Sequence, residues 1–455
     1  MRNIKKFANR AAYTAFRNSN EYVEPHLSII EGEPKVVLND YVYGNTPEPL
    51  TFNIKSGGVI KWLRGSYDTQ SAFRVTLEYS KNGGTWTQIT AQDVDRGLMT
   101  YYDEYGGDGI IPSGGISVNS GDVVQFRAVS NPEYQTISDN EYGIYHSFFG
   151  TTCEFDVSGN IMSLIDQDFE DLTTVPGAFT YLFSGCLVQN SRKLILPATT
   201  MNSYCYSCMF INCADLRTPP ALPATTLVEG CYESMFKGCK KLKYVPTLPA
   251  TTLASYCYQN MFHGCTSLTS VPSLPATTLA SNCYDTMFSG CTGLTVAPEL
   301  PATTLANYCY NHMFDGCTSL TTAPESLPAT TMQKWSYQYM FYGCTSLTSA
   351  PTLSATTLAD GCYQYMFQGC TSLTTAPTLP ATTLVSNCYK YMFDSCSSLN
   401  YIKAMFTTTP SSSYTSNWVR GVAATGTFVK NTSAAWTTTG NDGIPTGWTV
   451  ETASS

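Results

Sequence analysis

The sequence predicts a mixed α/β multidomain protein with an N-terminal helix, an antiparallel β-sandwich, a solenoid of repeated coils and a C-terminal cap. Three observations support this prediction: a 26-residue internal repeat, β-rich alternating segments before it, and apolar residues at helical spacing near the N-terminus. The expected boundaries are 1–24 for the helix, 25–165 for the sandwich, 166–402 for the solenoid and 403–455 for the cap.

Composition argues against several classes of partner. Charged residues are 13% of the 455 residues, about half the usual share, and the formal net charge is −9. We expect no nucleic-acid partner, because phosphate binding requires clustered Lys and Arg. We expect no membrane span, because no apolar run approaches roughly 20 residues. The N-terminus lacks the apolar core of a secretory signal, which predicts a cytosolic chain unless a signal has been removed.

The N-terminal segment has the spacing of an amphipathic helix. Apolar residues recur every three or four positions from Ile4 to Phe16, and five basic residues lie between Arg2 and Arg17 of this acidic chain. The helix either packs on its own domain or docks onto an acidic partner. The docking residues would be Ile4, Phe7, Arg10, Phe16 and Arg17.

Residues 25–165 change to the two-residue period of strands. Segments such as LTFNIK, VIKWLRG, RVTLEYS and GISVNSGDVVQFRAVS alternate apolar and polar residues. Asn82-Gly83 supplies a hairpin turn, because both residue types tolerate positive φ. Several short strands at this spacing predict an antiparallel sandwich.

The repeat that follows is the strongest signal in the chain. Its Phe recurs at a nearly constant step, at positions 183, 210, 236, 262, 288, 314, 341, 367 and 393. Nine coils are therefore expected. Columns that hardly vary should point inward, namely the Leu columns, Met-Phe and the Cys of the Gly-Cys pair. The LPATT segment is also expected to be structural, with Thr columns that can hydrogen-bond along the axis. Trp418, Trp436 and Trp448 can cover the open end of the last coil.

The cysteines follow the same columns. One column holds seven and another nine, and Ser336 stands in the first column where cysteine is expected. Odd counts and a lone serine do not suit a disulfide framework. We therefore predict small buried thiols in the core. Cys205 and Cys208 form one CxxC pair, which is a weak zinc signal, and no metal site is predicted.

Columns that vary should face water and form the binding surface. These columns are the two positions before Met-Phe and the one after it. Tyrosine occupies the second position three times running. With coils about 4.8 Å apart, the rings would form an exposed ladder. The candidate ligand-binding residues are Tyr339, Tyr342, Tyr365, Tyr391, His312, Gln338, Gln364 and Lys390.

Catalytic signals are weak, and no catalytic residue or cofactor is predicted. The four histidines are His26, His146, His263 and His312, of which the last two occupy variable columns. No nucleophile elbow, phosphate-binding loop or zinc-protease motif is present. The acidic residues between Asp93 and Asp108 lack calcium-loop spacing, so a solvated loop is the favoured interpretation.

The repeat carries a family resemblance. The segment FHGCTSLTSVP, from Phe262 to Pro272, resembles the BspA-like (Treponema-type) leucine-rich repeats. The resemblance implies a leucine-rich-repeat-like solenoid on a cell-surface protein that binds host proteins, glycans or cells. The N-terminal segment from Met1 to Asp40 also resembles leader segments of virion proteins from phages of gut anaerobes, the crAss-like group among them.

Together these features favour a phage virion protein, a head or tail fibre-like appendage that binds a host surface glycan or protein. Its N-terminal region would attach to other virion proteins, and a homo-oligomer such as a trimer would be consistent with a fibre. The alternative is a BspA-like adhesin on the bacterial cell surface. A third hypothesis, a glycan-active enzyme, requires a pair of carboxylates in a cleft, which the sequence does not place.

Overall fold

The computed structural model describes residues 4–7, 27–30, 37–38, 48–65, 76–94, 114–129, 147–164, 176–197 and 201–453. These residues belong to two compact units, Met1–Pro47 and Glu48–Ser455. Among the described residues, no helix has the length and apolar character needed to cross a membrane.

The N-terminal unit contains a small sheet. Strand β1 (Ile4–Phe7) pairs in parallel with β2 (Leu27–Ile30), which pairs antiparallel with β3 (Val37–Leu38). The predicted docking helix is therefore wrong over Ile4–Phe7. Pairing with the apolar segment Leu27–Ile30 outweighs the helical spacing, which is a weak prior against tertiary contacts. The remainder of the predicted helix, including Arg10, Phe16 and Arg17, lies outside the described residues.

The predicted mixed α/β class is also wrong. In the described ranges, helix is confined to α3 (Ser412–Thr415) and the 3₁₀ turn η2 (Ile161–Leu164), and the rest is strand, bridge, turn and irregular backbone. The only segment predicted to be helical begins as a strand, and the coils change direction through turns. The described fold is therefore almost entirely β.

Two sheets begin the second unit. The six-stranded sheet has the order β13-β12-β4-β10-β6-β7, and the other has the order β11-β5-β8 with β9 also paired to β5. Their bounds are β4 (Leu50–Ile54), β5 (Gly58–Gly65), β6 (Thr76–Lys81), β7 (Thr87–Thr90), β8 (Gln92–Val94), β9 (Ile116–Val118), β10 (Val123–Ala128), β11 (Ser147–Thr151), β12 (Phe155–Asn160) and β13 (Val188–Ile195).

Aromatic rings join the two sheets. Phe149 of β11 packs 4.8 Å from Phe52 of β4 and 4.8 Å from Phe126 of β10, measured between ring centroids. The predicted sandwich is thus right in having two facing sheets. It is only partly antiparallel, because β12 pairs with β13 and β5 with β8 in parallel. The predicted hairpin at Asn82-Gly83 is present between β6 and β7, with φ of 54° and 71°.

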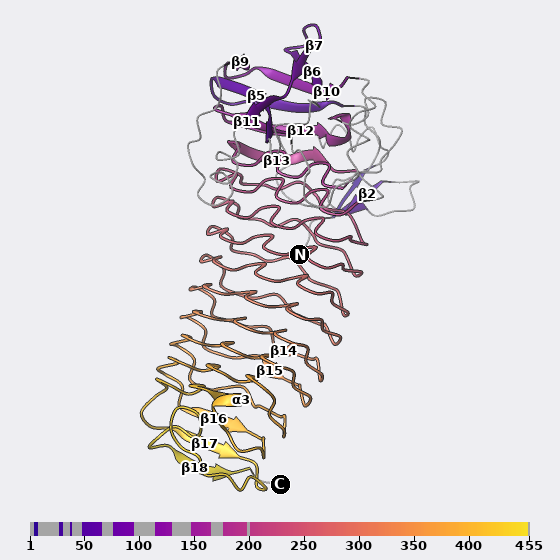
Figure 1. Cartoon of the computed structure of the whole chain (residues 1–455). Coiled ribbons are helices and arrows are strands. Elements are labelled where there is room, and N and C mark those ends of the chain that lie inside the picture. The colour runs from indigo at the N-terminus through magenta and orange to yellow at the C-terminus, as the bar shows by residue number, and fades with distance from the viewer. Residues whose placement is uncertain are drawn as a thin grey trace. The chain divides into compact units, whose positions relative to one another are not determined.

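The coils stack one on another between the sandwich and the C-terminal sheet (Figure 1). Backbone amides alternate between two partners. The N–H of Phe262 donates to Met287 O in the next coil at 2.9 Å, whereas the N–H of Met261 donates to Tyr258 O in its own coil at 3.2 Å. Alternate amides therefore join each coil to the next without long strands. Short strands also occur within the coils, where β14 (Ser326–Leu327) pairs in parallel with β15 (Thr352–Leu353).

The interior of the coils is built from ring ladders. Successive Phe rings of the repeat stack between 5.1 Å, for Phe183 and Phe210, and 5.8 Å, for Phe288 and Phe314. A second buried ladder of Tyr rings follows the cysteine column, from Tyr206 to Tyr389. Each coil leaves an apolar face that only its neighbour can cover, which is the energetic basis of a stacked repeat.

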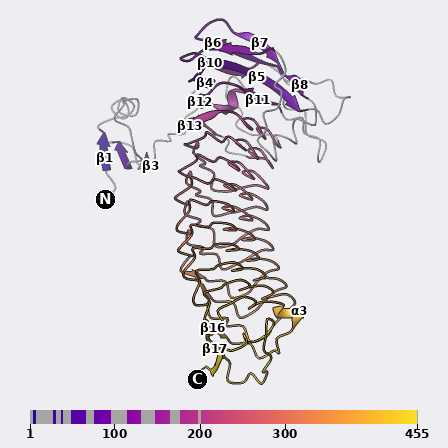
Figure 2. The same cartoon turned by 90° about the vertical axis from the view of Figure 1, so that its left-hand side faces the viewer.

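The C-terminal residues follow the coils with a parallel sheet of β16 (Tyr401–Ala404), β17 (Thr427–Lys430) and β18 (Thr449–Thr452). Figure 2 labels β16 and β17 near the C-terminus, and Figure 1 labels all three strands. Trp418, Trp436 and Trp448 are all buried there. Trp418 packs on Phe393, the last Phe of the ladder, and its indole N–H donates to Gly443 O at 2.9 Å. The apolar end of the last coil is thereby covered.

Candidate functional site

One side of each coil has a period of four residues, two buried and two at the surface. In the coil of Cys257 to Cys265, Cys257-Tyr258 and Met261-Phe262 are buried, whereas the pairs between them are partly exposed. The second residue of each surface pair has positive φ, so positive φ recurs every four residues along this side of the coil, as at Tyr256 (61°), Asn260 (54°) and Gly264 (72°). The backbone therefore turns at one residue in four, which adopts the left-handed conformation, and the side chain of that residue lies on the outer surface.

The predicted ladder occupies one of these left-handed columns. Tyr339 stacks on Tyr365 with ring centroids 4.4 Å apart, and Tyr365 stacks on Tyr391 at 4.8 Å. His312 extends the stack, 4.3 Å from Tyr339. We call His312, Tyr339, Tyr365 and Tyr391 the tyrosine ridge. It spans four coils with nearly parallel rings.

The ridge adopts a backbone conformation that disfavours tyrosine. Tyr339, Tyr365 and Tyr391 have φ of 55°, 60° and 55°. The left-handed region costs an ordinary side chain roughly 1 kcal/mol, and Asn or Gly would adopt it more readily. The same column holds Asn260 in an earlier coil, so the fold does not require tyrosine here.

Stacking decides which parts of the rings a ligand can reach. The ring faces cover one another, so the three tyrosines are only half-exposed, while Tyr342 beside them is 38% exposed and meets Tyr339 edge-on at 5.6 Å. Edges and hydroxyls are therefore presented to solvent, and flat stacking of a ligand on the middle rings is blocked. Burial and the neighbouring Tyr365 raise the pKa of Tyr339 to about 12, so its hydroxyl stays protonated and can donate.

Polar side chains flank the ridge and bridge adjacent coils. Gln338 Nε2 donates to Gln364 Oε1 at 3.1 Å, which fixes both predicted residues along one side. His312 Nδ1 lies 2.9 Å from Asp315 Oδ2. At the C-terminal end, the guanidinium of Arg420 lies 5.6 Å and the amine of Lys390 5.9 Å from the ring centroid of Tyr391. The structure thus brings the eight predicted ligand-binding residues together on one surface.

A second aromatic stack beside the ridge was missed by the sequence analysis. Trp335 stacks on Tyr308 at 4.8 Å, in the same two coils as Tyr339 and His312. Its other face lies against Gly361, where an added Cβ would approach the indole to 2.6 Å. The sequence held one clue to this stack. The segment KWSYQYMF, residues 334–341, departs from the repeat consensus and marks one coil as different at several surface positions.

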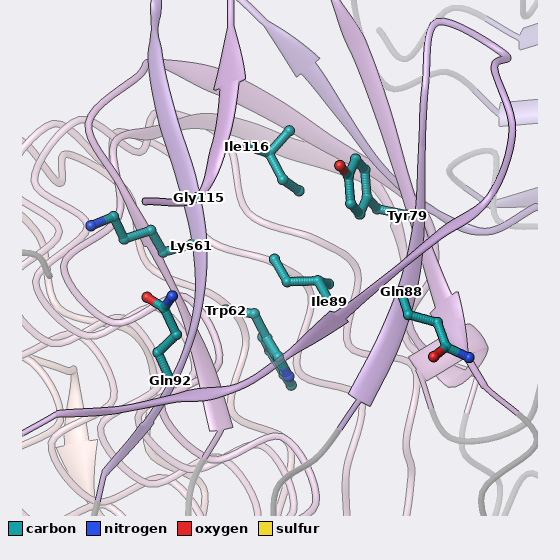
Figure 3. A pocket seen from close by; sticks show the side chains of 8 residues that line it. All are labelled: Lys61, Trp62, Tyr79, Gln88, Ile89, Gln92, Gly115 and Ile116. Carbon is teal, nitrogen blue, oxygen red and sulfur yellow. The ribbon is translucent and has the colours of Figure 1, made fainter. Parts of the chain in front are cut away.

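The sandwich contains a small pocket between the two sheets (Figure 3). Its lining residues are Lys61, Trp62, Tyr79, Gln88, Ile89, Gln92, Gly115 and Ile116. Burial lowers the pKa of Lys61, whose amine points away from Tyr79 (Figure 3). The lining includes no carboxylate or histidine. Within the described residues, no group of three or more His, Cys, Asp or Glu could hold a metal ion.

Comparison with known proteins identifies the repeat. The BspA type leucine-rich repeat region matches in six copies, over residues 172–295, 209–347 and 308–417. These matches cover more than half of the 455 residues. The chain belongs to the BspA-type leucine-rich repeat family. No curated protein matches it.

One solved structure resembles this BspA-type chain, a leucine-rich repeat protein from Bacteroides ovatus. The identity is 16% and the TM-score 0.22, with 67% of this chain and 96% of that chain covered. The repeat family is that of a surface or adhesin-like repeat protein. The comparisons do not show the resemblance of the segment from Met1 to Asp40 to phage virion proteins.

Proposed function

We propose that this chain is an adhesin-like protein of the bacterial cell surface, without catalytic activity, that binds a surface glycan or protein through the tyrosine ridge. The observation that supports the proposal is the run of Tyr339, Tyr365 and Tyr391 in a left-handed column. Backbone preference favours Asn or Gly at these positions, and the buried core does not use the rings. A role in binding explains why aromatic residues occupy them.

The ridge fits an elongated ligand better than a small one. The aligned hydroxyls and ring edges repeat once per coil, and the Gln338–Gln364 pair runs parallel to them. Tyr combines a rigid ring with a polar tip, so such a row provides hydrogen bonds at little entropic cost. A glycan chain or an extended peptide lying along the axis would contact several coils at once.

A phage particle is the other carrier, suggested by the segment from Met1 to Asp40. That hypothesis used a docking helix, and Ile4–Phe7 is a strand. Family membership supports the cell-surface form instead. Oligomerisation stays a prediction of the fibre hypothesis alone.

The test uses a substitution taken from the chain itself. Because Asn260 occupies the ridge column, Tyr339→Asn, Tyr365→Asn and Tyr391→Asn together should keep the fold. We expect the wild-type chain to bind a defined set of probes on a glycan array or on intact epithelial cells, and the triple variant to lose that binding. The matched control replaces three exposed Thr of another surface column, Thr251→Ala, Thr277→Ala and Thr303→Ala. Equal binding by the wild type and the triple Asn variant would refute the role of the ridge.

A further inference from the structure

A basic patch on two early coils departs from the rest of the surface. Lys240, Lys241, Lys243 and Tyr244 stand where the next coil has Thr266, Ser267, Thr269 and Ser270. Arg217 occupies the column of Lys243 one coil earlier. We call Arg217, Lys240, Lys241, Lys243 and Tyr244 the lysine patch. No acidic residue interrupts the segment from Lys237 to Tyr244, in a chain whose net charge is −9.

Backbone hydrogen bonds place these cations next to one another. The N–H of Lys241 donates to Ala214 O at 3.1 Å, and the N–H of Ser267 donates to Lys240 O at 3.2 Å. The segments carrying Arg217 and Lys243 are therefore direct neighbours in the stack. Like charges at adjacent positions of neighbouring strands destabilise a fold, so their retention calls for a reason beyond folding.

Few of these charges are neutralised within the chain. Lys241 pairs with Asp215. Arg217, Lys240 and Lys243 are exposed and form no ion pair with any described residue. Tyr244 lies beside Lys243 and is 62% exposed, the highest exposure among the large hydrophobic residues of the described chain. In this part of the structure, unpaired cations and an exposed aromatic ring thus share one small surface.

We propose that the lysine patch binds an acidic polysaccharide, with the cations on its carboxylate or sulfate groups and Tyr244 against a sugar ring. Unlike the rings of the ridge, Tyr244 stacks on no other ring of the described residues, so its face is available for a sugar. The patch is a second site, well separated in sequence from the ridge. It does not depend on what the ridge binds.

Charge spacing favours a glycan over nucleic acid. Duplex DNA carries one negative charge per ~1.7 Å of its axis, so beyond the patch it would meet the acidic remainder of the chain. A glycan such as hyaluronan carries its charges farther apart than duplex DNA and alternates them with uncharged sugar surface. Three lysines of one coil, with Arg217 in the coil before, lie beside one aromatic residue and match that alternation.

The experiment replaces the patch with the sequence of the next coil. The variant Lys240→Thr, Lys241→Ser, Lys243→Thr and Tyr244→Ser carries the residues of 266–270, which already fold in this repeat. Binding of full-length chain to heparin and to hyaluronan is measured by biolayer interferometry at low and at high salt. We expect wild-type binding to weaken with salt, and the variant to bind about tenfold or more weakly.

Three further variants identify the cause. Lys240→Arg, Lys241→Arg and Lys243→Arg together should keep the binding, because the charge is retained. Lys334→Gln with Lys403→Gln removes two cations elsewhere and should leave it unchanged. The ridge variant with three Asn substitutions should also bind both polyanions normally, which separates this proposal from the proposed function.

The result that overturns the proposal is unchanged binding in the coil-swap variant, or no binding of either polysaccharide by the wild type. Stronger competition by duplex DNA than by heparin of equal charge would also overturn it, and would assign the patch to nucleic acid. A thermal melt of the coil-swap variant that matches the wild type establishes that the lost binding is not lost folding.

Discussion

The Sγ of Cys265 lies 3.1 Å from the carbonyl oxygen of Phe236, one coil earlier. The same contact recurs up the stack, as in Cys291 to Phe262 at 3.1 Å and Cys396 to Phe367 at 3.0 Å. Each thiol thus donates to a backbone carbonyl of the preceding coil. The cysteine column is therefore a ladder of thiol hydrogen bonds, and all 18 cysteines are free and buried as predicted.

The first prediction is that these thiols do not react in the folded chain. Burial raises the pKa of Cys265 to about 12, so almost no thiolate exists at pH 8, and thiolate is the reactive form. We expect Ellman's reagent to label very few thiols in native buffer at pH 8. In denaturant the same chain should show 18. Rapid labelling of several cysteines without denaturant would contradict the ladder.

A second prediction concerns the serine that interrupts the other cysteine column. Ser336 is fully buried, and its hydroxyl donates to the sulfur of Met332, a weak acceptor, at 3.8 Å. A buried hydroxyl without a strong partner costs free energy, whereas a thiol is easily accommodated in an apolar site. We expect Ser336→Cys to stabilise the chain by about 1 kcal/mol.

Chemical denaturation with urea, followed by tryptophan fluorescence, measures this effect. Cys362→Ser, the reverse change at the same position of the next coil, is the matched control and should destabilise. A lower urea midpoint for Ser336→Cys would show that serine is required at this position.

The third prediction follows from the left-handed columns. Gly290 has φ of 70°, and an added Cβ would lie 3.6 Å from Gly264 Cα, an ordinary contact. Space therefore permits a side chain, and the cost comes from the backbone conformation. We expect Gly290→Ala to destabilise by about 1 kcal/mol and Gly290→Asn by less, although Asn is larger. Asn212 already occupies this column with φ of 58°. Thermal melts that rank Asn below Ala would contradict this explanation.

These columns show how much of the fold the sequence could specify. The repeat period, the buried Leu, Met-Phe and Cys columns and the two facing sheets follow from apolar spacing alone. The strand over Ile4–Phe7 does not, because so short a segment with mixed spacing is decided by the strand it pairs with. Thr251 and Thr252 show that an invariant column need not point inward. The two Thr columns do not vary among the coils, yet both side chains are exposed. What their positions share is a backbone bridge between coils, as from Thr226 to Thr252.

The tyrosine ridge, too, could be predicted only in part from the sequence. The 26-residue step places Tyr339, Tyr365 and Tyr391 in one column, so their stacking follows from the sequence. What the sequence could not specify is that the ring faces cover one another, since this depends on the left-handed backbone and the side-chain angles. Trp335 was missed for a related reason: its stacking partner Tyr308 belongs to a column that holds Tyr, Gly or Asn in the other coils, so no long run of rings marks it.

The fourth prediction is a pH dependence of stability at Glu233. Burial raises the pKa of Glu233 to about 7, with Lys237 opposing the shift. The unfolded chain releases this proton near pH 4.3, so between about pH 4.5 and 7 the folded chain binds more protons than the unfolded one. The free energy of unfolding therefore falls as pH rises through this window.

A glutamine at this position removes the titration, and Gln259 occupies the same column in the next coil, so the Glu233→Gln variant should fold. We expect it to match the wild type at pH 4 and to be more stable at pH 8 by about 2 kcal/mol, measured by urea denaturation at both pH values. Equal stability of the two chains at pH 8 would mean that the carboxyl is solvated when ionised, and the predicted shift would be wrong.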